Sequence, residues 1–422
     1  MRAAKPLLPL LLLVLLLVPA RARASFDEFS DDRAPAHLEL QSDRLSLQLK
    51  GELKLGLHDI EGSGGPGRDS PTDTRTLGTR SPIVEIDAFW LALRFGLGSG
   101  LGVFSLLDFT SGGEVDSAWL DYRFGSPSLS HHLQLGYQPP IVAIDRRTER
   151  YPLTATSYWR ESELHLAYEL AFAPSDRVVL EAGASLAMMR PLGFAGLQQS
   201  HSQAGTINLL ASGSAQPFSG NGPVGGGRLK LTAFGVWLEA FGFLGKLAAQ
   251  GGTDVLRSGF PGYRELPGYS EEDSGSASFG WAGGRIGYTG HGLYALAEVI
   301  ASREGLLRRV GGYAQLSYRI ELSETRDWLR TLEPLVRYEV YRLLGSTEPH
   351  AGRALRSPAV INAVSWDWDV LTLAVALEAW RDLFFVRLEY FRIDESNGVP
   401  ALDIPDEPLR NNELLLLAAF RF

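Results

Sequence analysis

The chain has 422 residues, no cysteine and a formal net charge of −9. Without cysteine it can form neither a disulfide framework nor a thiolate metal site, and its acidic balance is unlike that of a nucleic-acid-binding protein. Hydrophobic residues make up 45% of the sequence, and 46 glycines accompany them. The chain is too long for one ordinary β-sandwich, yet no interdomain linker divides it.

The first 24 residues have the three parts of a secretory signal peptide. Arg2 and Lys5 form a positive n-region, residues 7–18 form an apolar core, and Ala22-Arg23-Ala24 is a small-residue cleavage site. The apolar core is shorter than the roughly 20 residues that a membrane-spanning helix needs, although a retained N-terminal helix is the alternative interpretation. Cleavage removes four basic residues and no acidic one. It leaves 36 of the 40 basic residues against 49 acidic ones, a net charge of −13.

Alternation of apolar and polar residues is the main pattern of the remaining sequence. Over residues 45–57, leucines recur on one face and mostly polar residues on the other, a period of two that predicts a strand. The same period is least regular over 101–109 and at a break near Phe234, and residues 360–366 are a candidate for one more strand. In all it predicts sixteen strands, near residues 45–57, 83–97, 101–109, 115–124, 131–138, 162–173, 177–188, 227–233, 235–245, 278–289, 292–301, 309–322, 332–342, 370–380, 383–393 and 412–422.

The connections between these strands are sorted by length. Six are tight turns, and six are long loops, over residues 58–82, 139–161, 189–226, 246–277, 343–369 and 394–411. Short periplasmic turns and long external loops are typical of up-and-down transmembrane barrels, and only a closed barrel lets a sheet cross lipid without unpaired backbone groups. We therefore predict an all-β transmembrane antiparallel barrel of about 16 strands over residues 45–422. A short periplasmic segment over residues 25–44 precedes it, and the location is the outer membrane of a Gram-negative bacterium.

The closing sequence NNELLLLAAFRF fits this prediction. One of its faces is wholly apolar and ends in Phe420 and Phe422, while the other carries Glu413 and Arg421. In a barrel the apolar face contacts lipid, and the two phenylalanines lie in the periplasmic aromatic girdle. A terminal phenylalanine preceded by alternating apolar residues also resembles the signal that the outer-membrane assembly machinery reads.

Several segments resemble strands of the phosphate-selective porins O and P. They are AWLDYRFG (118–125), LQLGYQPP (133–140), GGYAQLSYRI (311–320), LEPLVRYEV (332–340) and the closing NELLLLAAFRF. The resemblance covers about half of the chain beyond residue 24, in patches. It implies a 16-stranded porin that forms a homotrimer and folds its third external loop into the lumen. It does not carry phosphate selectivity with it, because the chain beyond residue 24 has only four lysines.

Charged side chains of both signs are predicted to face the lumen. Many alternate in sign two residues apart along one strand, so they either stiffen the wall through cross-strand pairs of about 0.2–1 kcal/mol each or set a transverse field across a water-filled pore. The predicted wall residues are Lys50, Glu52, Lys54, Arg94, Arg123, Arg319, Glu321, Arg337, Glu339, Arg387 and Glu389.

The third external loop, residues 139–161, is the one that the resemblance puts at the constriction. It carries Arg146, Arg147, Arg150 and Arg160 and three acidic residues. We predict that these arginines give the pore a mild anion preference, because a low-dielectric constriction weights nearby charges over the net charge of the chain.

Catalytic and metal sites find little support in the sequence. The eight histidines are scattered and lie outside the HExxH and nucleophile-elbow motifs. Acidic stretches at 271–273 and at Asp367 and Asp369 lack the spacing of a calcium loop. We expect no cofactor, no metal and no nucleic-acid partner. The predicted function is passive diffusion of small hydrophilic solutes or anions. The alternatives are an occluded barrel whose loops bind a surface partner and a hydrolase at the barrel rim.

Replacing Phe422 with aspartate should leave synthesis and export intact but lower the amount of folded barrel, because it alters the terminal signal and puts a charge on the lipid face. The measurement is the amount of heat-modifiable protein in outer-membrane fractions. An unchanged amount would show that the terminal apolar face has no part in assembly.

Overall fold

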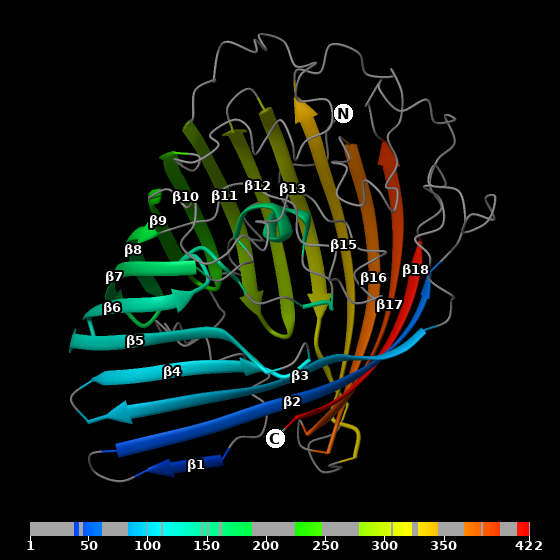
Figure 1. The fold of residues 1–422 in the computed structure, drawn as a ribbon, viewed down its shortest axis with the longest axis horizontal. Helices are drawn as coiled ribbons and strands as arrows, with labels where there is room; N and C mark the ends of the chain where they lie inside the picture. The colour runs from blue at the N-terminus through cyan, green and yellow to red at the C-terminus, as the bar shows by residue number, and fades with distance from the viewer. Residues whose placement is uncertain are drawn as a thin grey trace, which may run out of the picture.

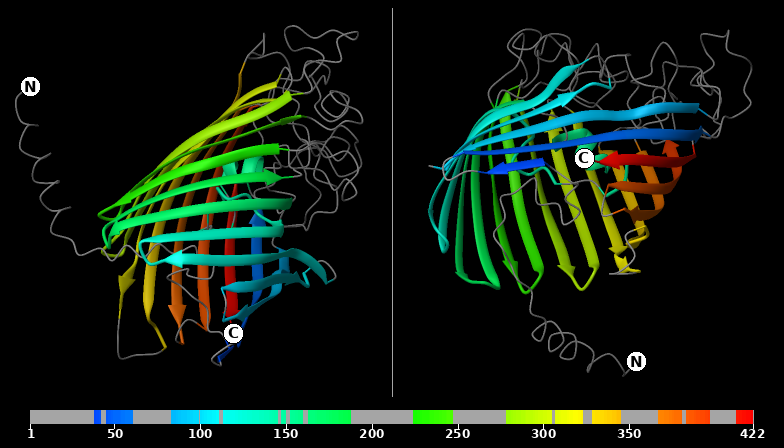
Figure 2. Two further views of the ribbon diagram at one scale, coloured as in Figure 1. Left: turned by 90° about the vertical axis from the view of Figure 1, so that its left-hand side faces the viewer. Right: turned by 90° about the horizontal axis from the view of Figure 1, so that it is seen from below.

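The computed structural model describes residues 38–41, 45–60, 83–98, 100–110, 113–144, 147–149, 152–159, 163–187, 224–246, 278–304, 307–322, 328–344, 367–380, 383–396 and 412–421. These residues form one closed wall of antiparallel strands (Figure 1). Figure 2 shows that the strands are inclined to the barrel axis, as closure of a sheet requires. Within the described residues, no helix is both long and apolar enough to span a bilayer.

The predicted sixteen-stranded barrel is confirmed. Each strand pairs with its neighbours in sequence, and the wall closes where β18 pairs with β2. A short β1 lies outside this count, and β13 and β14 form one interrupted strand against β15. The strands are β1 (Leu38–Gln41), β2 (Leu45–Ile60), β3 (Ile83–Leu97), β4 (Leu101–Asp108), β5 (Glu114–Ser126), β6 (Leu129–Gln138), β7 (Glu163–Ser175), β8 (Val178–Ala187), β9 (Val224–Ala233), β10 (Val236–Lys246), β11 (Ser278–Gly290), β12 (Leu293–Glu304), β13 (Leu307–Tyr318), β14 (Ile320–Glu321), β15 (Thr331–Leu344), β16 (Asp367–Ala379), β17 (Phe384–Ser396) and β18 (Glu413–Arg421).

The closing seam is shared by the two ends of the chain. β18 pairs with residues 52–60 of β2, and β1 takes the same edge of β2 at residues 46–49. β1 and β18 run in the same direction, so together they cover that edge almost without a break. An uncovered strand edge would leave unpaired donors and acceptors, and this arrangement leaves few of them. Residues 1–24, the predicted signal peptide, residues 25–37 and Phe422 lie outside the described residues.

The tight turns gather at one end of the barrel, which we call the turn end; the opposite end is the loop end. Phe234-Gly235 and His291-Gly292 each have two residues at positive φ, between +51° and +83°, as a two-residue hairpin turn of the favoured twist requires. The predicted break near Phe234 and the tight turn between the strands predicted at 278–289 and 292–301 are thus confirmed. Residues 360–366 and most of the predicted long loops lie outside the described residues.

The two faces of the wall differ as the alternation predicted. On β18, Leu414, Leu416 and Phe420 are exposed on the outside, whereas Leu415 and Leu417 are fully buried on the inside. Outward aromatic side chains meet near the turn end, where the Phe124 ring stacks on the His131 ring at 4.6 Å. An apolar outer belt bordered by aromatic rings is the surface that a transmembrane barrel presents to lipid.

Replacing Leu416 with arginine should lower the free energy of unfolding by about 2–4 kcal/mol, because this side chain faces outward near the middle of β18. The measurement is denaturant unfolding of the barrel in lipid vesicles. The control is Ser128→Arg, in an exposed turn, which should change the stability little. Equal effects of the two substitutions would contradict the assignment of the lipid face.

Candidate functional site: a lumen crossed by the third loop

The segment that follows β6 crosses the inside of the barrel. From Gln138 it runs to the π-helical turn η1 (Ala155–Trp159), which lies within the ring of strands in Figure 1. On the way, Glu149 accepts a hydrogen bond from Lys54 Nζ of β2 at 2.9 Å, and the Leu153 amide donates to Glu339 of β15 at 2.6 Å. The third loop therefore lies inside the lumen, where the resemblance put it, and its role as a constriction stays a prediction.

Wall carboxylates hold this loop. The Glu149 amide donates to both oxygens of Glu389, at 2.8 and 3.1 Å. Glu298 accepts from Trp159 Nε1 at 3.2 Å and from the Thr154 hydroxyl. Hydrogen bonds to ionised acceptors are about twice as strong as neutral ones, so these contacts, with the one to Glu339, fix the loop against β12, β15 and β17.

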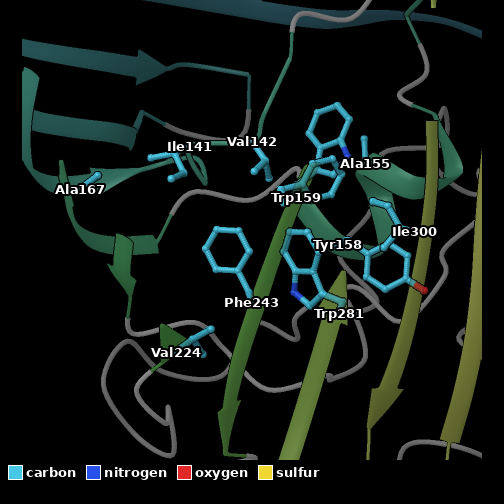
Figure 3. Close-up of a cluster of buried hydrophobic side chains, with 11 residues drawn as sticks. Ile141, Val142, Ala155, Tyr158, Trp159, Ala167, Val224, Phe243, Trp281 and Ile300 are labelled. Carbon is cyan, nitrogen blue, oxygen red and sulfur yellow. The ribbon is translucent and has the colours of Figure 1, made fainter. Parts of the chain in front are cut away.

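An apolar cluster anchors the far end of the loop. Trp159 and Tyr158 lie over the inner faces of β10 and β11, beside Phe243 and Trp281 (Figure 3). The Phe243 and Trp281 rings stack with centroids 4.7 Å apart, and the Tyr158 hydroxyl is 3.0 Å from that of Ser302 on β12. Burial of such aromatic side chains, each worth roughly 1.5–3 kcal/mol, favours one fixed position for η1.

A second apolar cluster, which the residue alternation did not predict, occupies the loop end of the lumen. Leu153 of the loop packs there against inward side chains of β15 to β18. The members are Leu153, Tyr341, Trp368, Val370, Phe391, Ile393, Leu415 and Leu417. The loop-end half of the lumen is therefore partly filled by apolar side chains.

A charge ladder crosses β8 to β12 at one level. In the register Glu181 is opposite Lys230, which is opposite Glu239, and the row continues through Arg285 to Glu298. Lys230 lies 3.2 Å from Glu181, Arg285 lies 3.2 Å from Glu239, and Arg285 also pairs with Glu298. Each charge thus has an opposite charge on a neighbouring strand, which a buried charge needs.

The predicted wall residues of β2 are buried and face inward. Lys50, Glu52 and Lys54 are at most 5% exposed, Lys54 is 3.1 Å from Glu52, and Arg421 donates to Glu52 at 2.8 Å. The barrel closure therefore brings the last strand's arginine to the first strand's glutamate.

The other predicted wall residues also take part in pairs. Arg337 donates to Glu339 at 2.6 Å, and Arg387 lies 3.4 Å from Glu389. Arg319 pairs with Glu378 at 3.0 Å. The strand is interrupted at Arg319, and Glu321, opposite Thr331 of β15, is exposed at the turn end.

Of the four predicted loop arginines, the structure describes Arg147. Its guanidinium is 3.1 Å from Glu333 and lies 3.7 Å from the centroid of the Tyr294 ring. Arg146, Arg150 and Arg160 lie outside the described residues.

The two members of several lumen pairs differ in exposure. The basic side chain is the exposed one: Arg94 (19%) and Arg123 (34%) against Asp121 (4%), Arg147 (20%) against Glu333 (7%), Lys230 (26%) against Glu181 (8%), and Arg319 (22%) against Glu378 (8%). The carboxylates lie behind the bases, close to the wall. In these five pairs, water in the lumen therefore meets the base more than the acid, whereas in the pair of Lys54 (6%) with Glu149 (12%) the acid is the more exposed member.

Three buried histidines were not assigned from the sequence. His58 lies between Asp87 and Glu413, at 2.8 Å from each. An irregularity in the pairing of β2 with β3 at Lys54 and Leu55 shifts the alternation of β3, which turns Asp87 inward. A two-residue period cannot show such a shift in advance.

His132 and His165 are the other two. His132 lies 3.7 Å from both Asp121 and Glu169. His165 Nδ1 is 3.0 Å from the Ser185 hydroxyl, so the structure brings a serine beside this histidine. Both histidines are deeply buried. A catalytic triad would need a carboxylate bonded to His165, and no hydrogen bond among the described residues provides one.

Among the described residues, no group of three or more acidic or histidine side chains is arranged to hold a metal ion.

Solved structures of outer-membrane channels share this barrel. OprB of Pseudomonas putida, solved at high pH, has a TM-score of 0.53 at 11% identity, over 90% of this chain and 94% of OprB. An anion-selective porin from Comamonas acidovorans gives 0.51 at 10% identity, over 90% and 100%. The outer membrane channel DcaP of Acinetobacter baumannii gives 0.50 at 10% identity, over 90% and 99%.

At these identities the likeness gives the fold alone. No protein-family model and no curated protein sequence matches the chain, so the phosphate-selective porins are not distinguished from other porins. The chain has the 16-stranded barrel fold of the outer-membrane porins.

Proposed function

We propose that the protein is an outer-membrane porin through which small hydrophilic solutes diffuse, with a preference for anions. The exposure of the lumen charges carries this proposal: Arg94, Arg123, Arg147, Lys230 and Arg319 each meet water more than their acidic partners do. Charges that line a narrow low-dielectric passage determine which ions enter it. The proposal includes a non-enzymatic role, a cleaved signal peptide and assembly into a homotrimer.

The third loop would determine the size limit of the pore. Its fixed contacts with Glu298, Glu339 and Glu389 hold it across the lumen, so solutes would pass between the loop and the wall. Arg147, and with it Arg146, Arg150 and Arg160, would then act at the constriction. Pore-wall pairs such as Arg337 with Glu339 would hold the wall in shape.

An occluded barrel is the second candidate. The apolar packing of Trp159 and Leu153 against the wall favours it, because such contacts narrow the loop-end half of the lumen. Single-channel recording of the purified barrel in planar bilayers separates the two: discrete conductance steps support the porin, and their absence from folded protein supports the occluded barrel.

The anion preference is tested by the reversal potential under a salt gradient. The wild type should favour anions, and Lys230→Gln combined with Arg319→Gln should weaken the preference. Glu181 keeps Arg228 at 3.7 Å in that variant, and Glu378 keeps the Thr331 hydroxyl at 2.7 Å, so neither carboxylate is left alone. Arg146, Arg147 and Arg150 changed together to alanine should also weaken it.

The matched control is Arg392→Gln, because Arg392 faces outward and is 61% exposed; its selectivity should equal that of the wild type. A wild type that prefers cations would reject the proposed anion preference. An unchanged preference in the loop variant alone would assign selectivity to the wall and not to the loop.

Orientation is tested by cysteine labelling of intact cells, which needs no prior removal of native cysteines. A cysteine at Ser270, in a predicted external loop, should react with an impermeant reagent. A cysteine at Ser175, at the turn end, should not. The reverse labelling pattern would show that the turn end faces outward, and so would contradict the proposed orientation.

A further inference from the structure

Trp237 faces the lumen near the turn end, at the second position of β10. The next residue, Leu238, is exposed on the outside, and Glu239 is buried on the inside, so Trp237 shares the inner face of the strand with Glu239. Phe241 and Phe243, farther along the same face, are buried against the third loop, whereas Trp237 is only partly buried. Water in the lumen therefore reaches this side chain.

A glycine on the neighbouring strand lets the Trp237 indole lie against the wall. The register places Gly287 of β11 directly opposite Trp237. A Cβ at Gly287 would lie 2.3 Å from Trp237 Cε2, 2.4 Å from Cζ2 and 2.6 Å from Nε1, so the ring covers the position that a larger side chain would fill. One face of the indole is thus turned to β11, and the other is turned to the lumen.

Other aromatic rings of the lumen are covered by cationic groups at closer range. The Arg147 guanidinium lies 3.7 Å from the centroid of the Tyr294 ring, and that of Arg421 lies 4.1 Å from the centroid of the Phe385 ring. On Trp237, no ring and no guanidinium of the described residues is in contact, and the indole N–H donates to none of them. The lumen face of Trp237 is therefore available to a solute.

Lys230 of β9 brings a positive charge to this ring. Its Nζ lies 5.4 Å from the centroid of the Trp237 ring and 3.2 Å from Glu181. Lys230 is 26% exposed and Glu181 8%, so the ammonium group lies between the carboxylate and the water. An ammonium has three donors, so Lys230 can bind the anionic group of a solute while it stays paired with Glu181.

We propose that Trp237 and Lys230 bind aromatic carboxylates at the turn end of the lumen. The ring of the solute stacks on the lumen face of the indole, and its carboxylate accepts a hydrogen bond from Lys230 Nζ. Stacked aromatic rings are offset, with centroids about 4.5–7 Å apart, and the distance from Nζ to the indole centroid is of the same size. One small molecule therefore reaches both groups.

The solute class follows from the combination of the two side chains. A small inorganic anion would use Lys230 alone, and a neutral ring would use Trp237 alone, so an aromatic carboxylate gains the most. This inference rests on the proposed function and names one class among the anions that the porin would admit.

The test is equilibrium binding of 4-fluorobenzoate to the full-length folded barrel in detergent, measured by fluorine NMR. Trp237→Leu should weaken binding about fivefold, because the stacking partner is lost. Lys230→Gln should weaken it about tenfold, because a charged donor is lost. In this variant Glu181 keeps Arg228 at 3.7 Å.

Gly287→Ala is the sharpest variant, because it keeps both binding groups and displaces the indole from the wall. It should weaken binding of 4-fluorobenzoate about as much as Trp237→Leu does. In competition on the wild type, benzoate should displace the probe at a lower concentration than cyclohexanecarboxylate, which has the same charge but no flat ring. On Trp237→Leu the two competitors should be alike.

The matched control is Trp380→Leu, the same substitution in the turn between β16 and β17, where Trp380 is 55% exposed; it should bind the probe as the wild type does. Equal binding by Trp237→Leu and the wild type would overturn the proposal. Equal displacement by benzoate, cyclohexanecarboxylate and chloride on the wild type would overturn it too, in favour of any small anion. This second result decides the question even if a variant fails to fold.

Conductance in planar bilayers keeps this inference separate from the proposed function. Because Trp237 lies near the turn end, a solute reaches it from that end whether or not the loop end is open. A wild type without conductance would reject the channel and leave the binding titration readable. A wild type that conducts but does not bind 4-fluorobenzoate would reject the aromatic carboxylate site alone.

Discussion

Every backbone donor and acceptor of a membrane-spanning sheet must be paired inside the sheet, because lipid offers no partner. The sixteen-strand closure of β18 on β2 satisfies this requirement, and β1 extends it along the edge of β2 that β18 leaves. Closure of the sheet also encloses a lumen. Once the outer face is apolar, the polar positions of each strand converge on the lumen, so the same alternation that lets the sheet cross a membrane supplies a charged interior.

That interior can hold so many charges because they are arranged in pairs. The ladder from Glu181 to Glu298 joins five strands through opposite charges, and Glu298 also holds the third loop through Trp159. Breaking one buried pair typically costs about 3–5 kcal/mol, so the ladder and the loop depend on each other. In the pairs of Arg94, Arg123, Arg147, Lys230 and Arg319 the base lies nearer the water than its carboxylate, so these pairs present positive charge to the lumen.

The alternation predicted all sixteen strands and the two faces of β18, because a two-residue period is local and needs no knowledge of partners. It could not predict the apolar cluster around Trp368 and Leu415, since an apolar side chain inside a barrel has the same sequence signature as one outside. Nor could it predict the inward position of Asp87, which depends on the pairing irregularity between β2 and β3. The partners of Glu149 and Thr154 are more than 90 residues away in sequence, and only the closed barrel brings them together.

The account depends on a water-filled, positively lined lumen, and thiol chemistry tests this directly. Thr232 on β9 faces inward beside Lys230, and the adjacent Leu231 faces outward. In lipid vesicles, a cysteine at position 232 should react with an anionic methanethiosulfonate faster than with a cationic one of similar size, and a cysteine at position 231 should react with neither. An inert cysteine at position 232, or one that reacts faster with the cationic reagent, would contradict the account.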